Sequence, residues 1–147
     1  MQYREALLTD IPQLTHVRLS VQENVLSDPS LVTEADYIDY LTVRGKGWVC
    51  SSGGQIVGFA IADLQDHNVW ALFVLPQYAG MGIGKQLHNL MLNWYFGQTQ
   101  QNIWLGTAFH TRAEKFYRIQ GWLETGTNGS KEIKFEMSYK RWQQLNS

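Results

Sequence analysis

Glycines at alternate positions give this chain its clearest chemical signal. Gly80, Gly82 and Gly84 lie in residues 78–85, between an apolar run expected to be a strand and a stretch expected to be a helix. Because glycine has no Cβ, successive main-chain N–H groups can point inward and a ligand can approach the backbone closely. The positive end of the following helix adds to the same field. The loop therefore predicts a phosphate or pyrophosphate site, where Lys85 could add a point charge.

Two familiar phosphate motifs do not fit this loop. A P-loop requires glycine where this chain has Ala79, and serine or threonine where it has Gln86. The dinucleotide fingerprint is G-x-G-x-x-G, whereas the spacing here is G-x-G-x-G. A nucleotide-phosphate enzyme is accordingly disfavoured. The other interpretation of the loop is a glycine-rich turn that only lets a helix pack close to a sheet.

Among the ionisable side chains, Tyr117 is the candidate proton donor. From its position alone it could equally be an aromatic residue on the buried face of a helix, beside Ala113 and Phe116. His16 and His88 fall within expected helices and have no metal-ligand spacing, so no metal is predicted.

The elements that must position these groups follow from periodicity and turn residues. Strands are expected at 3–8, 47–52, 55–64, 68–75, 102–108, 122–125 and 132–139. Helices are expected from Asp10 with apolar positions as far as Val25, at 33–41, from Ile83, and from Thr111 to Gly121. Residues 33–36 and 111–114 have capping-box spacing, and 126–130 is an expected turn between the last two strands. The order β-α-α-β-β-β-α-β-α-β-β predicts an α/β fold, with a mixed sheet of six to seven strands and about four helices.

Composition limits the class of protein. A chain of 147 residues is expected to form a single domain, 1–147. Its net charge of −1 shows no basic stripe, so nucleic acid is not an expected partner. The lone Cys50 fits a reducing compartment. Since no signal peptide or membrane span is visible, the predicted location is cytoplasmic, with no membrane partner.

Two separated segments form a more specific pattern than the glycine loop alone. Residues 72–87 read LFVLPQYAGMGIGKQL, a strand ending in V-x-P, then the loop, then a helix. Residues 113–122 read AEKFYRIQGW. Together they resemble the acyl-CoA motif and the A-x-x-F-Y-x-x-x-G-F/W motif of the GCN5-related N-acetyltransferase (GNAT) family. The resemblance covers essentially the whole chain and weakens over residues 9–45.

The resemblance implies an acetyl-CoA site. The main chain of Leu72, Phe73 and Val74 would pair with the pantetheine arm. Tyr117 matches the tyrosine near the thioester sulfur, and the diphosphate would be held by the main-chain amides of Ala79, Gly80, Met81, Gly82, Ile83, Gly84 and Lys85. Ala79 stands where the family often has arginine or glutamine. His110, the expected coenzyme contact after the next strand, stands where it often has asparagine.

Acyl transfer to an amine raises two proton problems. Neutralising an alkyl amine of pKa about 10.4 at pH 7 costs roughly 4–5 kcal/mol, so a base is useful. The leaving thiolate needs a general acid, which is the role expected of Tyr117, and a main-chain N–H near Val74 would meet the developing oxyanion. Direct attack requires no covalent enzyme intermediate, so Cys50 need not be a nucleophile.

The acceptor side is less determined by the sequence. Candidate substrate or base residues are Glu23, Glu34, His67 and Asn68, with Asp63 at the end of a strand. Each could equally be a solvated surface group. Acidic residues in 20–45 would suit a cationic small-molecule or peptide amine. A second hypothesis is an inactive domain that binds acyl-CoA as a sensor or partner module. Homodimers are common in this family, so a homodimer is a further expectation.

Overall fold

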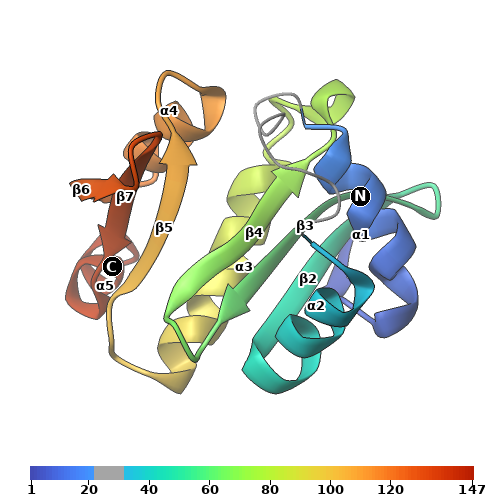
Figure 1. The fold of residues 1–147 in the computed structure, drawn as a ribbon, viewed down its shortest axis with the longest axis horizontal. Helices are drawn as coiled ribbons and strands as arrows, with labels where there is room; N and C mark the ends of the chain where they lie inside the picture. The colour runs from blue at the N-terminus through green and yellow to red at the C-terminus, as the bar shows by residue number, and fades with distance from the viewer. Residues whose placement is uncertain (22–31) are drawn as a thin grey trace.

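A seven-stranded mixed sheet forms the centre of the protein (Figure 1). The computed structural model describes residues 1–21 and 32–147. The strands are β1 (Gln2–Glu5), β2 (Gly45–Ser52), β3 (Gln55–Asp63), β4 (Asn68–Val74), β5 (Ile103–Ala108), β6 (Leu123–Asn128) and β7 (Glu132–Met137). Their order across the sheet is β1-β2-β3-β4-β5-β7-β6, and every neighbouring pair is antiparallel except β4 and β5. The predicted α/β fold class is confirmed.

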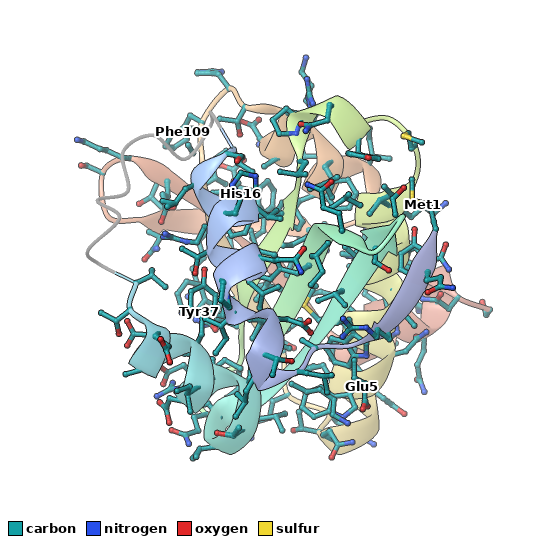
Figure 2. All side chains as sticks on the ribbon, turned by 90° about the vertical axis from the view of Figure 1, so that its right-hand side faces the viewer. Met1, Glu5, His16, Tyr37 and Phe109 are labelled. Atoms are coloured by element: carbon teal, nitrogen blue, oxygen red, sulfur yellow. The ribbon has the colours of Figure 1, made fainter. Side chains whose placement is uncertain are left out.

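Helices cover both faces of the sheet. α1 (Ile11–Leu19) and α2 (Glu34–Asp39) lie on one face, and α3 (Ile83–Gln98) packs on the other, as Figure 2 shows from the side. α4 (Arg112–Ile119) follows β5, and α5 (Tyr139–Leu145) follows β7. Apolar residues recurring along α3 bury Leu87, Met91 and Tyr95 against the strands.

Several element ends differ from those that periodicity predicted. α1 ends at Leu19 rather than near Val25, which lies outside the described residues. The second helix ends at Asp39, and a π-helical turn, Tyr40–Arg44, continues from it. β6 runs on into the expected 126–130 turn. The last expected strand ends at Met137, because Ser138 accepts a hydrogen bond from the Arg141 amide (3.1 Å) and begins a fifth helix that was not predicted.

Capping residues explain where two helices begin. Thr33 and Asp36 form the reciprocal capping box that their spacing predicted: Thr33 Oγ1 accepts from the Asp36 amide, and Asp36 accepts from the Thr33 amide. Asp10 precedes α1 but does not cap it with its side chain. Its carboxylate instead accepts hydrogen bonds from the two terminal nitrogens of Arg4 (2.8 and 3.0 Å) and from the Leu7 amide. It therefore connects β1 to the turn before α1.

The strands β4 and β5 separate soon after they meet. Only one register pair joins them, Asn68 with Trp104, supported by a hydrogen bond from the Trp104 amide to the His67 carbonyl (2.9 Å). Beyond this pair the strands diverge into a V that opens towards the glycine loop (Figure 1). The buried residues fall into two clusters accordingly: one around β2–β4, the other around β5 and β7, with α3 contributing to both.

His88 lies at the centre of the second cluster and is fully buried. The Trp122 indole N–H donates to His88 Nε2 (2.9 Å), so Nδ1 carries the proton and donates to Asn89 Oδ1 (2.9 Å). Rings of Phe116, Trp122 and Trp142 pack edge-on against the imidazole. This histidine therefore joins α3, α4 and α5 as a neutral structural group.

Gly45 provides a test of the β2–β3 packing. A Cβ atom there would lie 1.7 Å from the Ala62 carbonyl oxygen, so Gly45→Ala must push two strands apart. We expect a loss of about 3 kcal/mol in the free energy of unfolding by urea titration. Gly97→Ala is the matched control: a Cβ at Gly97 meets nothing within 4 Å, and the gain in α3 should be up to about 0.5 kcal/mol. Equal stabilities of the two variants would contradict the described packing.

His88 predicts a pH-dependent stability. Burial lowers the pKa of His88 from 6.5 to about 4, so the unfolded chain binds this proton more readily than the folded one. The contribution of His88 is fully present above pH 6.5 and is lost as the pH falls towards 4. Between pH 7 and 4.5, the wild type should lose about 2 kcal/mol more unfolding free energy than His88→Gln. Parallel losses in both proteins would show that His88 can be protonated in the folded state.

Candidate active site

A cleft of about 650 Å³ occupies the space where β4 and β5 diverge. Its walls are residues 69–74 of β4 and 105–108 of β5. The glycine loop and the first turn of α3 line one end, α4 lines the side next to β5, and Val21 adds to the rim. The splayed sheet thus brings the two sequence motifs to one cavity.

The glycine loop has the conformation of an anion cradle. Gly80 and Gly82 adopt left-handed backbone conformations (φ 78° and 81°), and a Cβ at either would meet nothing within 4 Å. The space beside the loop is therefore open to a ligand. Within the described part of the chain, the amides of residues 80–85 form no hydrogen bond. The loop leads directly into the sixteen-residue helix α3, whose first amides have no partner within the helix. Free N–H groups at a helix N-terminus suit a diphosphate.

Not every amide of the predicted cradle is available. The Ala79 N–H donates to the Pro76 carbonyl (3.1 Å) and closes a 3₁₀ turn, so this amide is committed within the chain. Met81 exposes its side chain (58%) away from the cleft lining, which leaves only its amide for the cradle. Ala79, Gly80, Gly82, Ile83, Gly84 and Lys85 all line the cleft.

The edge of β4 that faces β5 presents free main-chain groups. The Leu75 amide donates to the Val57 carbonyl (2.8 Å), so it points to β3. Because successive peptide groups of a strand point to opposite sides, the main-chain groups of Leu72 and Val74 point into the cleft, and those of Phe73 point to β3. The strand pairing skips Trp70, so a bulge lies between Val69 and Ala71.

Tyr117 lines the same cleft from α4 while being 6% exposed. Phe116 and Trp122 contact its ring edge-on, and Phe135 packs from β7. Burial raises the pKa of the Tyr117 phenol well above its ordinary value near 10. The side chain therefore stays protonated at neutral pH and can donate a proton or a hydrogen bond.

The turn before α4 does not form the reciprocal capping box that its sequence predicted. Thr111 Oγ1 accepts from the Glu114 amide (3.2 Å), but the Glu114 carboxylate accepts from the His110 amide (2.8 Å) instead of that of Thr111. His110 adopts a left-handed conformation (φ 62°), which turns its N–H towards this carboxylate. The hydrogen bonds from His110 and Arg118 lower the pKa of Glu114. Ala108 and Thr111 line the cleft, whereas His110 does not.

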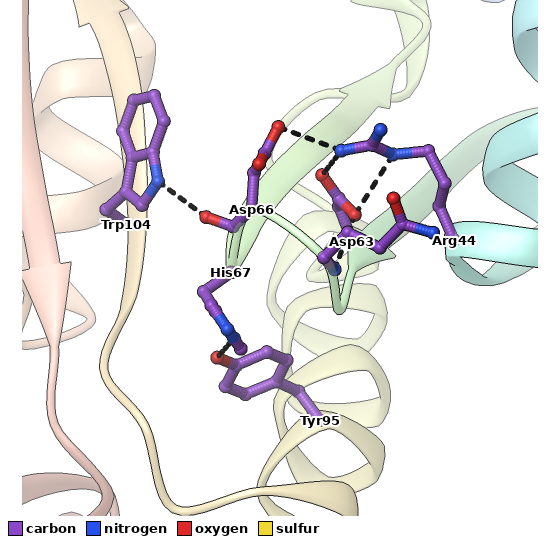
Figure 3. Close-up of polar contacts among 7 residues, drawn as sticks. Arg44, Asp63, Asp66, His67, Tyr95 and Trp104 are labelled. Atoms are coloured by element: carbon purple, nitrogen blue, oxygen red, sulfur yellow. Dashed lines mark hydrogen bonds and ion pairs between the residues drawn. The ribbon is translucent and has the colours of Figure 1, made fainter.

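The closed end of the V holds the remaining candidates from β3 and β4 (Figure 3). His67 has a left-handed conformation (φ 56°), and its Nδ1 lies 2.9 Å from the Tyr95 hydroxyl. Asp63 is fully buried and accepts from Arg44 Nε (3.3 Å), an Arg44 terminal nitrogen (2.8 Å) and the Gln65 amide (2.9 Å). These contacts anchor the β3–β4 turn. Asn68 and His67 do not line the cleft, and the amide oxygen of Asn68 is buried without a partner in the described structure.

The acidic residues of 20–45 do not converge on the cleft in the part that is described. Glu34 is exposed on the first turn of α2, and the Asp36 carboxylate accepts a hydrogen bond from the Thr33 amide. Glu23 lies outside the described residues. The charged side chains that line the cleft among residues 1–21 and 32–147 are Lys85 and Arg112, and neither an acidic residue nor a histidine joins them.

Sequence reasoning did not single out Trp70, which also lines the cleft. Its place on a strand that flanks the glycine loop was the available signal, but a strand pattern does not show which tryptophan lies at a splay. Within the described ranges, no three His, Cys, Asp or Glu side chains cluster closely enough to hold a metal ion. None of the helices in those ranges is both long and apolar enough to span a membrane.

Known proteins resemble this chain in sequence and in architecture. Residues 11–122 match the family model described as Acetyltransferase (GNAT) family. N-acetyltransferase 8 of Mus musculus is 33% identical over 97 residues, which are 59% of this chain and 43% of the mouse protein. N-acetyltransferase family 8 member 2 of Rattus norvegicus is 30% identical over 106 residues, 63% of this chain and 47% of the rat protein. The matched part thus spans less than half of either relative.

Solved structures share the fold at low sequence identity. The PaiA N-acetyltransferase of Thermoplasma acidophilum, in complex with coenzyme A, has a TM-score of 0.80 at 15% identity, covering 94% of this chain and 98% of that one. A GNAT-family acetyltransferase of Staphylococcus aureus Mu50 has the same TM-score at 21% identity, with the same coverage. The family model covers 112 of the 147 residues and includes both the glycine loop and Tyr117. This chain belongs to the GNAT family of acetyltransferases.

Proposed function

We propose that the protein is an N-acetyltransferase that moves an acetyl group from acetyl-CoA to a primary amine by direct attack. The observation that carries the proposal is one cleft that combines the open amides of the glycine loop with the buried phenol of Tyr117. When bound, acetyl-CoA supplies an activated acyl group as a thioester. Everything else has to come from the residues around the cleft and from the acceptor.

The loop and β4 bind and orient the co-substrate. The amides of residues 80–85 would hold the diphosphate, and Lys85, which forms no ion pair with the described residues, adds positive charge. The inward main-chain groups of Leu72 and Val74 would pair with the amide-containing arm, as a further strand would. The end of the arm then lies beside Leu72, two residues before Val74, so the Leu72 N–H is the fixed donor nearest to the developing oxyanion.

Tyr117 acts as the proton donor to the leaving thiolate. Its raised pKa keeps the phenol protonated throughout the neutral range. A thiol has a pKa of about 8.5, below that of this phenol, so the Tyr117 hydroxyl stabilises the thiolate mainly through a hydrogen bond. The proton that it passes to the sulfur is replaced by the one that the amine loses on acylation. The described lining supplies no carboxylate or imidazole base, so the amine would enter neutral or release its proton to water.

A second candidate is a domain that binds acyl-CoA without turnover. The lack of a carboxylate or histidine in the described cleft lining favours it, because nothing in that part can take the proton of an alkyl ammonium. Release of free thiol from acetyl-CoA in the presence of amines separates the two candidates.

Gly82→Glu tests the anion cradle. The substitution adds bulk and negative charge to the open space beside the loop, so we expect binding of acetyl-CoA in a thermal-shift titration to be abolished. Gly129→Glu is the matched control, since Gly129 also has a left-handed conformation (φ 67°) and open surroundings, but in the β6–β7 turn. If both variants kept the wild-type affinity, the diphosphate would not lie at this loop.

Tyr117→Phe tests the proton donor. The variant keeps the ring contacts and loses only the hydroxyl, so kcat should fall about 100-fold while the Kd for acetyl-CoA changes little. Tyr95→Phe is the control, because the Tyr95 hydroxyl donates to the Asn102 carbonyl at the closed end of the V and does not line the cleft. An unchanged kcat in Tyr117→Phe would remove this residue from the chemistry.

A further inference from the structure

An aromatic stack lies beside the cleft and extends to a buried ion pair. The Trp70 and Tyr40 rings are stacked, with centroids 4.1 Å apart and planes at 12°. Tyr37 meets Trp70 edge-on at 5.3 Å. The Arg44 guanidinium lies over the Tyr40 ring, 4.8 Å from its centroid. Tyr40 is therefore held between the indole and a cation, and of these residues Trp70 lines the cleft.

The far end of this stack is fixed. Arg44 forms ion pairs with Asp63 and Asp66, both at 2.8 Å, and the Asp63 side chain is fully buried (Figure 3). The π-helical turn Tyr40–Arg44 brings both its first and last residues to the stack. The stack thus connects a rigid turn between β3 and β4 to one wall of the cavity, which limits the positions open to Trp70.

The position of Trp70 along β4 relates the stack to the acceptor. If the diphosphate lies at the glycine loop, the arm runs along β4 past Val74 and Leu72 towards the closed end. Trp70 is four residues from Val74, roughly 13 Å along a strand, so it lies beyond the stretch that the arm would pair with. A group that contacts Trp70 is then on the far side of the reacting carbonyl, where the amine must approach.

The described lining of the cleft offers aromatic surface and no negative charge. No acidic side chain lines it, so nothing in this part of the chain would pair with the second ammonium group of a polyamine. Aromatic rings bind flat apolar groups through stacking and edge contacts. We infer that Trp70, positioned by Tyr40 and Arg44, forms the specificity wall for the acceptor, which is a primary amine carried on an aromatic group rather than a polyamine. This inference rests on the acetyl-transfer function proposed above.

The test compares three amines, with each rate referred to the concentration of neutral amine at the assay pH: 2-phenylethylamine, hexylamine and 1,5-diaminopentane. Thiol release from acetyl-CoA should give a kcat/KM for 2-phenylethylamine roughly three- to tenfold above that for either other amine. Trp70→Leu should remove this preference by raising the KM for 2-phenylethylamine, with the Kd for acetyl-CoA unchanged. Trp94→Leu is the matched control, because Trp94 lies on α3 outside the cleft lining, where its ring contacts Trp48 and not the stack.

Two variants at Tyr40 separate a positioning role from a general loss of structure. Tyr40→Leu removes the stacked ring and should raise the KM for 2-phenylethylamine, whereas Tyr40→Phe keeps the ring and should preserve the preference. Thermal melts with and without acetyl-CoA show whether each variant is folded and still binds the co-substrate. A rise in KM confined to the aromatic amine is not expected from a residue that only supports the fold.

The outcomes distinguish this inference from the function on which it rests. Equal kcat/KM values for the three amines, or a preference unchanged in Trp70→Leu, would overturn the aromatic wall and leave acetyl transfer intact. A preference for 1,5-diaminopentane would overturn it in favour of a cationic acceptor. Stabilisation by acetyl-CoA with no thiol release from any amine would overturn both and support the non-catalytic candidate.

Discussion

The edge of β4 that faces β5 is the feature on which the remaining structure depends. Beyond the Asn68–Trp104 pair, no described strand accepts or donates hydrogen bonds along this edge, although the strand is central in the sheet. Buried peptide groups without partners are costly, so such an edge persists only where water or a ligand can reach it. The 650 Å³ cleft provides that access. An extended ligand with amide groups would complete the sheet, which is why a carrier of acyl groups fits here.

The two ends of the cleft are built in different ways. At the open end, left-handed glycines and an unpaired helix N-terminus supply main-chain donors, and Lys85 adds one positive charge. At the closed end, side chains fix the backbone: Asp63 and Arg44 hold the β3–β4 turn, and the His67 carbonyl joins it to β5. The open end suits a constant ligand, the diphosphate. The aromatic side chains near the closed end would suit a choice between acceptors.

The sequence predicted those features of the site whose residues lie close together in continuous motifs. The glycine loop, the strand before it and Tyr117 lie within continuous motifs, and all contribute to one cleft. His67, Asn68 and His110 could not be placed, because their distance from the cleft depends on where β4 and β5 part and on left-handed turns. The position of Trp70 depends on a bulge in β4 and on the π-helical turn Tyr40–Arg44, which is distant in sequence. Periodicity reveals neither. α5 was missed because its start at Ser138 follows a strand without a glycine or proline break.

The single register pair between β4 and β5 also affects how the two halves of the sheet can move relative to each other. Each half of the sheet has its own buried cluster, and α3 contributes buried residues to both. Val69 and Leu72 of β4 also pack against both clusters, so this packing would limit any change of angle between the halves. A ligand that bridges β4 and β5 would draw the halves together. Occupancy of the cleft would then be communicated to β6 and β7, the outermost strands of the sheet, as a change in tilt.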